Sequence, residues 1–322
     1  MHACADAAGP DETCGASLWL DALPGPLFSA ARADSDALSS LPPNFWVPAS
    51  VLHGCEAPSA LFEQVTAALV ARCGGCAPST AGAEVWCQVY RTPGAGLPFH
   101  WDKDEARLAK QQEWSHPARS FVVYLNSAAE CAPPRLGATH VLCQRFDTGA
   151  GEARPATPRA GCLCWPTSNA AFSFDGRLSH GVLDSDSPVI RRALLVNLWD
   201  EQPLSVERIC ASEFSRSGLA PPLEVPGPTN DAATAVSLPL LSLSAAAHCR
   251  ADAVEPPTVE ALARDAGFGG ATCVLLRHPD CVIWQLSVDG RTAAALVSDE
   301  QAAAAAEADE EEEEAEEEAE QG

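Results

Sequence analysis

The segment between Glu84 and Trp199 constrains the fold most, because it alternates short apolar runs with breaks rich in glycine, proline and aspartate. Short runs dominated by valine, leucine and aromatic residues are typical of β-strands. The expected strands are 84–91, 120–126, 139–145, 161–165, 170–174 and 190–199. Many short strands joined by such turns predict a mainly β fold, a double-sheet jelly roll, rather than a parallel α/β sheet.

One amphipathic helix is expected before these strands, over residues 59–72. Leu61, Val65 and Leu69 recur there at helical spacing. Ser59 follows Pro58 and is the expected N-cap, because a serine hydroxyl can accept a hydrogen bond from the first free backbone N–H groups. The helix should therefore pack its apolar face against the rest of the domain.

Composition divides the chain into five segments. We expect a partly irregular N-terminal segment, a jelly-roll domain, a linker rich in proline, alanine and serine, a small appendage, and a disordered acidic tail. Their bounds are 1–57, 58–205, 206–256, 257–300 and 301–322. The appendage should contain a short helix followed by a hairpin that turns at Asp289 and Gly290.

The charge balance argues against nucleic acids and anionic membranes as partners. The formal net charge is −24, and −13 remains without the eleven carboxylates between Glu307 and Glu320. A body this acidic lacks the basic surface that phosphate binding needs. The N-terminus has no basic region followed by an apolar one, and no later apolar run reaches membrane-spanning length. We therefore expect an unsecreted, cytoplasmic protein, with the nucleus as a second compartment.

The fourteen cysteines are expected to be reduced thiols that pack as small apolar residues, because disulfides are rare in unsecreted proteins. One cluster leaves a second interpretation open. His53 and Cys55 precede Cys73 and Cys76, and these four residues could form a zinc site. The two glycines between Cys73 and Cys76 also fit the end of a helix, and we favour structural cysteines.

The stretch PFHWDKDE contains candidate metal ligands. Residues i and i+2 of an extended strand face the same way, so His100 and Asp102 can converge on one ion. Two imidazoles and one carboxylate are the ligands of non-haem Fe(II) oxygenases, and they leave three positions free. His180, at the end of a candidate strand, is the expected second histidine. His140 and His116 are the rivals, interpreted as a core or outer-face residue and as a linker residue.

A pair of arginines begins the last expected strand. A guanidinium matches a carboxylate with two parallel hydrogen bonds, so an arginine can hold one end of a dicarboxylate whose other end binds the metal. Alternation along the strand places Arg191 on the same face as Asn197 and Arg192 on the other. We favour Arg191, because its face also carries a small residue and suits a pocket wall, and Arg192 stays the alternative. Asn197 is interpreted as a wall residue.

Together these residues resemble the Fe(II)/2-oxoglutarate-dependent dioxygenases, within them the prolyl-4-hydroxylase-like branch, and there an uncharacterised algal-type subgroup. The resemblance covers about 85–200. Its ordered matches are Tyr90 ten residues before His100, the Tyr124-Leu125-Asn126 strand, Gly137-Ala138-Thr139, the stretch PRAGCLCW, and the segments FHWDKDE, FDGRLSHGV and RRALLVNLW. Two departures are Ala138, where the family has a second glycine, and a slightly longer spacing from His180 to Arg191. The intact Asp102 favours hydroxylation over halogenation.

The resemblance implies a full set of site residues and cofactors. Iron would be bound by His100, Asp102 and His180. Arg191, helped by Tyr124, would hold the far carboxylate of 2-oxoglutarate, and Tyr90 would lie beside the iron and the co-substrate. The reaction implied is oxidative decarboxylation of 2-oxoglutarate to succinate, coupled with O2-dependent hydroxylation of an unidentified peptide side chain, such as proline, or of a small molecule. Ascorbate is a further candidate cofactor.

A second hypothesis belongs to another class of protein. The chain could be a catalytically silent jelly-roll module that binds a metal or a partner, with the appendage and the acidic tail as interaction elements. The intact triad and the arginine argue against it, because a binding module has no need of all four. Lys103, Asp104 and Glu105 are expected to form a solvated rim.

Overall fold

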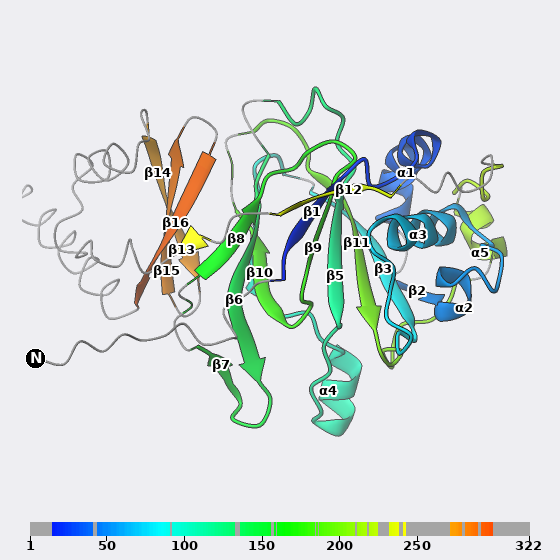
Figure 1. Cartoon of the computed structure of the whole chain (residues 1–322), viewed down its shortest axis with the longest axis horizontal. Helices are drawn as coiled ribbons and strands as arrows, with labels where there is room; N and C mark the ends of the chain where they lie inside the picture. The colour runs from blue at the N-terminus through cyan, green and yellow to red at the C-terminus, as the bar shows by residue number, and fades with distance from the viewer. Residues whose placement is uncertain are drawn as a thin grey trace, which may run out of the picture.

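The structure is a computed structural model of the 322-residue chain. It describes residues 15–40, 44–90, 92–132, 136–155, 158, 160–183, 185, 187–209, 211–217, 219–224, 232–237, 241–242, 271–278, 281–288 and 291–298. Within these ranges two antiparallel sheets face each other, and helices cover one of them (Figure 1). The prediction of a mainly β jelly roll is therefore confirmed.

The larger sheet has seven strands in the order β12-β1-β9-β5-β11-β3-β2. The bounds in chain order are β1 Ser17–Leu20, β2 Phe45–Pro48, β3 Gly82–Val89, β5 Arg119–Tyr124, β9 Ala171–Phe174, β11 Arg192–Trp199 and β12 Thr234–Ser237. β11 pairs with β3 along its whole length and with β5 on its other side. The strand that begins at the arginine pair is therefore central.

The smaller sheet has the order β13-β8-β6-β10-β4, with β7 paired to β6. Its strands are β4 Leu97–His100, β6 Thr139–Asp147, β7 Glu152–Arg154, β8 Ala160–Cys164, β10 Leu178–Val182 and β13 Leu241–Ser242. β10 lies between β4 and β6, antiparallel to both. The two segments that carry the candidate histidines are thus direct neighbours.

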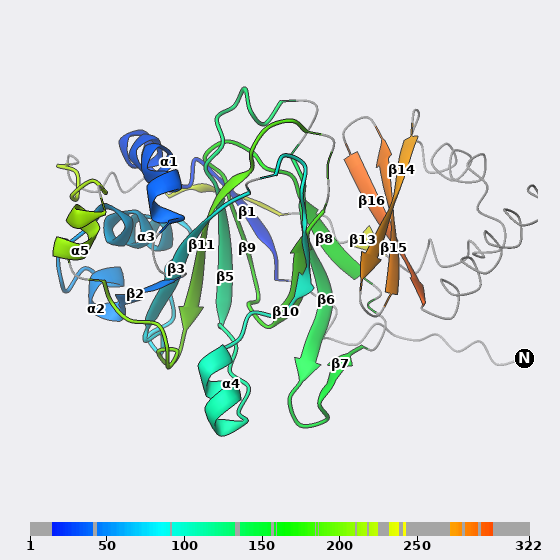
Figure 2. The ribbon, with the colours of Figure 1, turned by 180° about the vertical axis from the view of Figure 1, so that it is seen from behind.

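The helices are α1 Gly25–Leu38, α2 Ala49–Leu52, α3 Leu61–Arg72, α4 Glu105–Gln111 and α5 Ala211–Arg216. Seen from both sides, α1 and α3 lie over the outer face of the larger sheet, near β3 and β11 (Figures 1 and 2). Alternate strand residues such as Val85 and Val196 join Phe62 and Leu69 in one buried cluster there. Burial of each large apolar side chain contributes about 1.5–3 kcal/mol. The opposite strand faces are left free to line the space between the sheets.

The predicted N-cap of α3 is wrong. The helix begins at Leu61, and the residue in the N-cap position is Ala60, without a side-chain cap. Ser59 instead donates to Glu63 Oε2 from its backbone N at 2.7 Å and from its hydroxyl at 2.9 Å. Glu63 is fully buried and also receives Arg208 Nε at 2.7 Å. A buried carboxylate is costly unless it is hydrogen-bonded, so Ser59 serves this carboxylate rather than the helix end.

The segments on either side of 58–205 contribute to the sandwich. β1 and β2 lie in the stretch expected to be partly irregular, and β12 and β13 lie in the expected linker. β12 pairs with β1 and β13 pairs with β8, so each late strand extends the edge of one sheet. The jelly roll thus includes more of the chain than its composition suggested.

The appendage contains the expected hairpin and one further strand. β15 Cys281–Val288 and β16 Arg291–Ser298 pair antiparallel on either side of residues 289 and 290, and β14 Ala271–His278 adds an unpredicted third strand. The predicted helix before residue 270 and the acidic tail lie outside the described residues. In the part of the chain that the structure covers, none of the helices has the length and apolar character to cross a membrane.

Candidate metal centre

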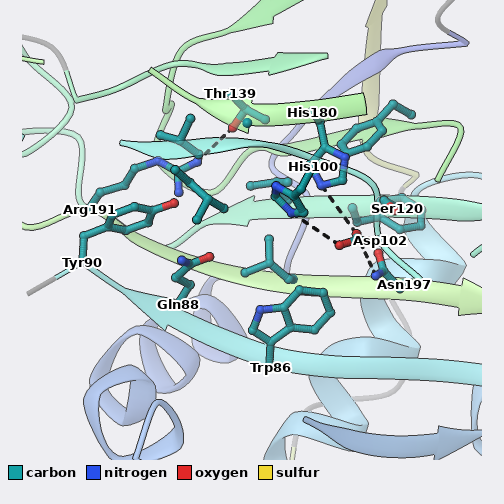
Figure 3. A pocket seen from close by; sticks show the side chains of 17 residues that line it. Trp86, Gln88, Tyr90, His100, Asp102, Ser120, Thr139, His180, Arg191 and Asn197 are labelled. Carbon is teal, nitrogen blue, oxygen red and sulfur yellow. Dashed lines mark hydrogen bonds and ion pairs between the residues drawn. The ribbon is translucent and has the colours of Figure 1, made fainter. Parts of the chain in front are cut away.

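His100 and His180 lie opposite each other in paired strands, β4 and β10. Their ring centres are 4.5 Å apart, and both rings point into the space between the two sheets (Figure 3). Asp102 follows β4 by two residues. Its Oδ1 lies 3.5 Å from His100 Nε2, and its Oδ2 lies 3.5 Å from His180 Nε2. The strand pairing therefore brings together three potential ligands that are up to 80 positions apart in sequence.

The three ligand atoms lie within 4.8 Å of one another. Among the described residues, no other group of three or more histidine, cysteine, aspartate or glutamate side chains lies close enough to hold a metal ion. In the alternative zinc cluster, His53 Nε2 lies 3.8 Å from Cys76 Sγ, but Cys73 and Cys55 complete no such group. The structure thus favours structural cysteines here, and Cys55, Cys73 and Cys76 are free thiols. The prediction that every cysteine is reduced is wrong, because Cys143 is disulfide-bonded.

Each histidine ring is oriented by a backbone carbonyl. His100 Nδ1 lies 2.9 Å from the oxygen of Pro98, and His180 Nδ1 lies 3.0 Å from the oxygen of Leu178. A carbonyl oxygen only accepts hydrogen bonds, so these contacts assign the proton to Nδ1 and leave the Nε2 lone pair free for a metal. Two such imidazoles and a carboxylate fit Fe(II) by their chemistry.

The charge states of the centre follow from its burial and from the groups around it. Burial alone would raise the pKa of Asp102, but the nearby His180 and His100 and the hydrogen bond from Asn197 bring it well below its usual range. Burial also lowers the pKa of His180, against the attraction of Asp102. An ionised carboxylate and a neutral imidazole are the forms that bind a metal.

Arg191 lies in the same pocket as the three ligands, at its other end. It is 3% exposed, and its Nη2 donates to Thr139 Oγ1 at 2.9 Å. The guanidinium carbon lies 5.2 Å from the ring centre of Tyr90 and 5.5 Å from that of Tyr124. Arg191 Nε and the Tyr90 hydroxyl are buried without hydrogen-bond partners. A buried cation with an unpaired donor is costly, so this end is suited to an anionic ligand.

Tyr124 is linked to Arg191 through the hydroxyl of Thr139. Its OH lies 2.9 Å from Thr139 Oγ1, the atom that accepts from Arg191, and 3.2 Å from the oxygen of Cys164. Thr139 thus links the two candidate co-substrate residues. Its importance could be read from the sequence only through the Gly137-Ala138-Thr139 match.

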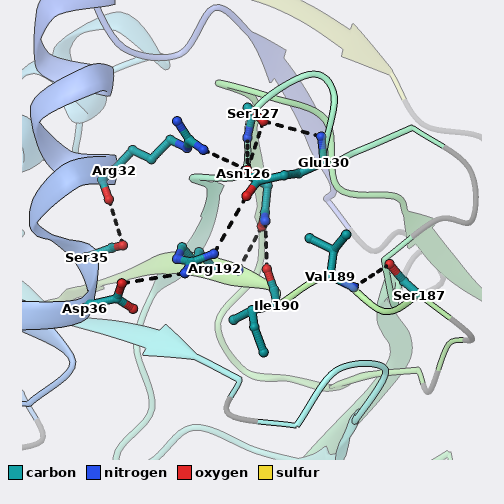
Figure 4. A network of polar contacts seen from close by, with 10 residues as sticks. All are labelled: Arg32, Ser35, Asp36, Asn126, Ser127, Glu130, Ser187, Val189, Ile190 and Arg192. Carbon is teal, nitrogen blue, oxygen red and sulfur yellow. Dashed lines mark hydrogen bonds and ion pairs between the residues drawn. The ribbon is translucent and has the colours of Figure 1, made fainter.

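Arg192 lies on the opposite face of β11 and takes part in a polar network with α1 (Figure 4). Its Nη atoms lie 3.6 Å from Asp36 Oδ2 and 3.9 Å from Glu130 Oε1. Asn126 fixes the backbone here, because its Oδ1 accepts from Arg192 N and its Nδ2 donates to the oxygen of Ile190, both at 2.8 Å. These bonds on either side of Arg191 hold its side chain inward. The structure therefore places Arg191, and not Arg192, in the pocket.

Two further contacts hold Asp102, and sequence reasoning missed both. Asn197 Nδ2 donates to Asp102 Oδ2 at 3.0 Å, and His116 Nδ1 lies 2.7 Å from the backbone oxygen of Asp102. The only sequence signal for Asn197 was its place on the Arg191 face of the strand. Neither rival histidine joins the centre: His116 orients the Asp102 backbone, and His140 is fully buried beside Phe99, with ring centres 5.3 Å apart.

The loop after Asp102 forms an aromatic contact with the β6–β7 hairpin. Trp114 stacks on Phe146 with ring centres 4.1 Å apart, and Lys103 Nζ lies 5.6 Å from the Trp114 ring. Asp104 was expected in a solvated rim but is only 3% exposed, because it caps α4 and accepts from Arg107 N at 3.0 Å. α4 and the hairpin project from the same end of the sandwich (Figures 1 and 2).

Gly181 allows β10 to lie close to β4. A Cβ at this position would lie 2.8 Å from the oxygen of Leu97 and 3.2 Å from the nitrogen of Phe99. We expect Gly181→Ala to lower the free energy of unfolding by about 1–3 kcal/mol, the usual effect of overpacking. The variant should also bind Co(II), which takes the same types of ligand as Fe(II), more weakly. The added methyl group would push β4, which carries His100, away from β10 and His180.

Urea unfolding and a Co(II) titration check this prediction. Gly149→Ala is the matched control, since Gly149 lies in the exposed β6–β7 turn, where the nearest atom to an added Cβ is Asp147 Oδ1 at 3.4 Å. Equal stability and equal cobalt affinity in the two variants would show that the close approach at Gly181 is not needed.

Comparison with known proteins gives matches among solved structures alone. No protein-family model matches the sequence, and no curated protein matches it. A prolyl-4-hydroxylase from Pseudomonas putida is 19% identical, with 59% of this chain and 90% of that chain covered and a TM-score of 0.33. A prolyl hydroxylase from Trichoplax adhaerens, in complex with a hypoxia inducible factor oxygen degradation domain peptide, is 15% identical, with 58% and 84% covered and a TM-score of 0.34.

A third match is EvdO2 from Micromonospora carbonacea var. aurantiaca, complexed with 2-oxoglutarate. It is 14% identical, with 60% of this chain and 89% of that chain covered and a TM-score of 0.34. The class that the fold and the site define is a jelly roll with two histidines, one carboxylate and a buried arginine in one pocket.

Proposed function

We propose that the protein is an Fe(II)- and 2-oxoglutarate-dependent dioxygenase, which couples the oxidative decarboxylation of 2-oxoglutarate to succinate with the hydroxylation of a second substrate. One observation carries the proposal. A single pocket contains the group His100, Asp102 and His180 and, at its other end, the buried Arg191 with an unpaired Nε. A metal and a dicarboxylate would therefore each have a binding site in the same space.

His100, Asp102 and His180 would hold the iron. Two neutral imidazoles and one carboxylate leave Fe(II) with a net charge of about +1, which suits an anionic chelator and leaves three positions for other ligands. When bound, the iron supplies the redox chemistry that uses O2 and 2-oxoglutarate to oxidise a C–H bond. The protein fixes the three ligands on one side, through the β4–β10 pairing and the carbonyls that orient both rings.

Arg191 would bind the far carboxylate of 2-oxoglutarate. A guanidinium and a carboxylate form two parallel hydrogen bonds, which fix the orientation of the ligand as well as its position. The rings of Tyr90 and Tyr124 lie near the guanidinium, and the Thr139 hydroxyl is already bonded to it. The unpaired Tyr90 hydroxyl is a further donor for the ligand. Exclusion of water by these side chains strengthens the charge pairing.

The substrate is proposed as a side chain of a peptide, such as proline, or a small molecule. The peptide proposal draws on the Trichoplax adhaerens neighbour, which was solved with a peptide. The alternative function is a silent jelly-roll module that binds a metal or a partner. The unpaired Nε of Arg191 favours the enzyme, because a module without co-substrate has no use for a buried cation beside the metal centre.

Metal removal and replacement test the proposal. Protein stripped with EDTA should make no succinate from 2-oxoglutarate, and Fe(II) should restore production while Zn(II), which has no redox chemistry, should not. Under anaerobic conditions, Fe(II) and 2-oxoglutarate together should give a weak visible charge-transfer band. The assay is run with and without ascorbate. If iron-loaded protein gives neither the band nor succinate, the silent module becomes the better account.

A further inference from the structure

A row of buried polar side chains crosses the larger sheet next to the metal centre. Asn197 of β11 is paired with Glu84 of β3 on one side and with Ser120 of β5 on the other. These residues are 2%, 7% and 2% exposed. Polar groups this deeply buried are costly unless they are hydrogen-bonded. Packing alone therefore gives no reason for such a row in the middle of a sheet.

The Asn197 amide joins this row to the candidate ligand Asp102. Its Nδ2 donates to Asp102 Oδ2 at 3.0 Å (Figure 3). Glu84 is the partner of Asn197 in the β3–β11 pairing. Burial raises the pKa of Glu84 to about 7, and the hydrogen bonds from Asn44 and Trp199 oppose that rise. The amide thus donates to one carboxylate and neighbours a second one in the sheet.

Glu84 is itself fixed in place. Its Oε2 accepts from the indole nitrogen of Trp199 at 3.0 Å, and its Oε1 accepts from the Asn44 amide. Trp199 is 1% exposed and closely packed, so this carboxylate has little freedom to turn. If the Asn197 amide were flipped, its carbonyl oxygen would face the ionised Asp102 carboxylate, which cannot donate a hydrogen bond. The amide therefore directs its N–H groups toward Asp102, and the fixed Glu84 lies beside it in the neighbouring strand.

We propose that Asn197 is a positioning residue for Asp102 and that Glu84 acts through Asn197. A carboxylate that bound a metal through both oxygens would take a position that the co-substrate or O2 needs. Because Asn197 engages Oδ2, Asp102 is directed to bind through a single oxygen. The proposal rests on the proposed function only for the identity of the metal as iron. The role of Asn197 is tested by metal affinity, which does not require enzyme activity.

Cobalt is the probe, because Co(II) binds the same types of ligand as Fe(II) and has visible absorption that reports its coordination. Metal-free protein is titrated with Co(II) in the absence of 2-oxoglutarate. Asn197→Ala should weaken Co(II) binding by about 10-fold or more, as is usual when a group that orients a ligand is lost, and should change the absorption spectrum. Asn197→Leu, which keeps the volume of the side chain, should do the same if the alanine variant does not fold.

A double-mutant comparison tests the role of Glu84. Glu84→Gln alone should weaken Co(II) binding, but the pair Glu84→Gln and Asn197→Leu should bind no more weakly than Asn197→Leu alone, because Glu84 acts through the amide. Effects that multiply in the double variant would refute that part of the proposal.

Gln64→Ala is the control for the loss of a half-buried side-chain amide. Gln64 makes two hydrogen bonds with the backbone of Leu223, at 2.9 and 2.8 Å, and belongs to α3 on the outer face of the sheet. If the Asn197 variants bind Co(II) with the affinity and spectrum of Gln64→Ala, Asn197 does not position Asp102. Wild-type protein that binds Co(II) but makes no succinate would contradict the proposed function alone. Wild-type protein that does not bind Co(II) would contradict both.

Discussion

Replacing Arg191 with glutamine should raise the 2-oxoglutarate concentration needed for half-maximal succinate production by about 100-fold. Truncation of one partner of a buried charge pair costs about 2–5 kcal/mol, which corresponds to a factor between some tens and several thousands. Glutamine keeps much of the side-chain length but offers no charge and no paired donors. Co(II) affinity should stay close to that of the wild type, because Arg191 lies at the other end of the pocket from the ligands.

Arg192→Gln is the matched control for this prediction. It removes the same charge from the neighbouring position, but Arg192 faces Asp36 and Glu130 at 3.6 and 3.9 Å on the other side of β11. Partly exposed ion pairs of this length contribute about 0–1 kcal/mol, so their loss should disturb the pocket little. The 2-oxoglutarate concentration needed for half-maximal succinate production should change by no more than about 2-fold. Titration of the anaerobic Fe(II) protein with 2-oxoglutarate measures both variants. An equal loss of 2-oxoglutarate affinity in the two variants would show that Arg191 does not bind the far carboxylate of 2-oxoglutarate.

Replacing His180 with alanine should weaken Co(II) binding beyond the about 10–100-fold that loss of an outer orienting group produces, because a direct ligand is removed. Succinate production should fall with it. His180 is 8% exposed, and its ring packs on Phe174 with centres 4.9 Å apart, so the variant should also be less stable than wild type. Circular dichroism separates loss of the metal from loss of the fold.

His53→Ala is the control for His180→Ala. His53 is exposed, and its closest polar contact, Cys76 Sγ, lies 3.8 Å from Nε2. Its loss should leave Co(II) affinity unchanged. A folded His180→Ala variant that bound Co(II) as tightly as His53→Ala would remove His180 from the centre and, with it, the proposed iron site.

Much of the central sandwich follows from local sequence patterns. The apolar runs that became β3, β5, β6, β8, β9 and β11 are rich in side chains that pack on a sheet face, and glycine and proline separate them. Alternation along β11 also sufficed to divide Arg191 from Arg192, because a strand has only two faces. The position of Arg191 could therefore be predicted before any contact was known.

The remaining features depend on contacts between distant parts of the chain. The edge strand β12 pairs with β1 across more than 200 positions, and nothing in either four-residue stretch signals the other. Asn197 and Asp102 are 95 positions apart, and their hydrogen bond needs both sheets in place. Ser59 fits the local rule for an N-cap, but the buried Glu63 takes both of its donors.

The direct pairing of His100 with His180 limits where the chain can tolerate insertions and deletions. A single-residue insertion or deletion within β4 or β10 would turn one histidine to the other face of the sheet, since strand side chains alternate with a period of two. α4 and the β6–β7 turn lie in connections outside that ladder, and Trp114, which follows α4, stacks on Phe146 near the end of β6. Relatives of this chain can therefore diverge in these connections while the two histidines keep their register.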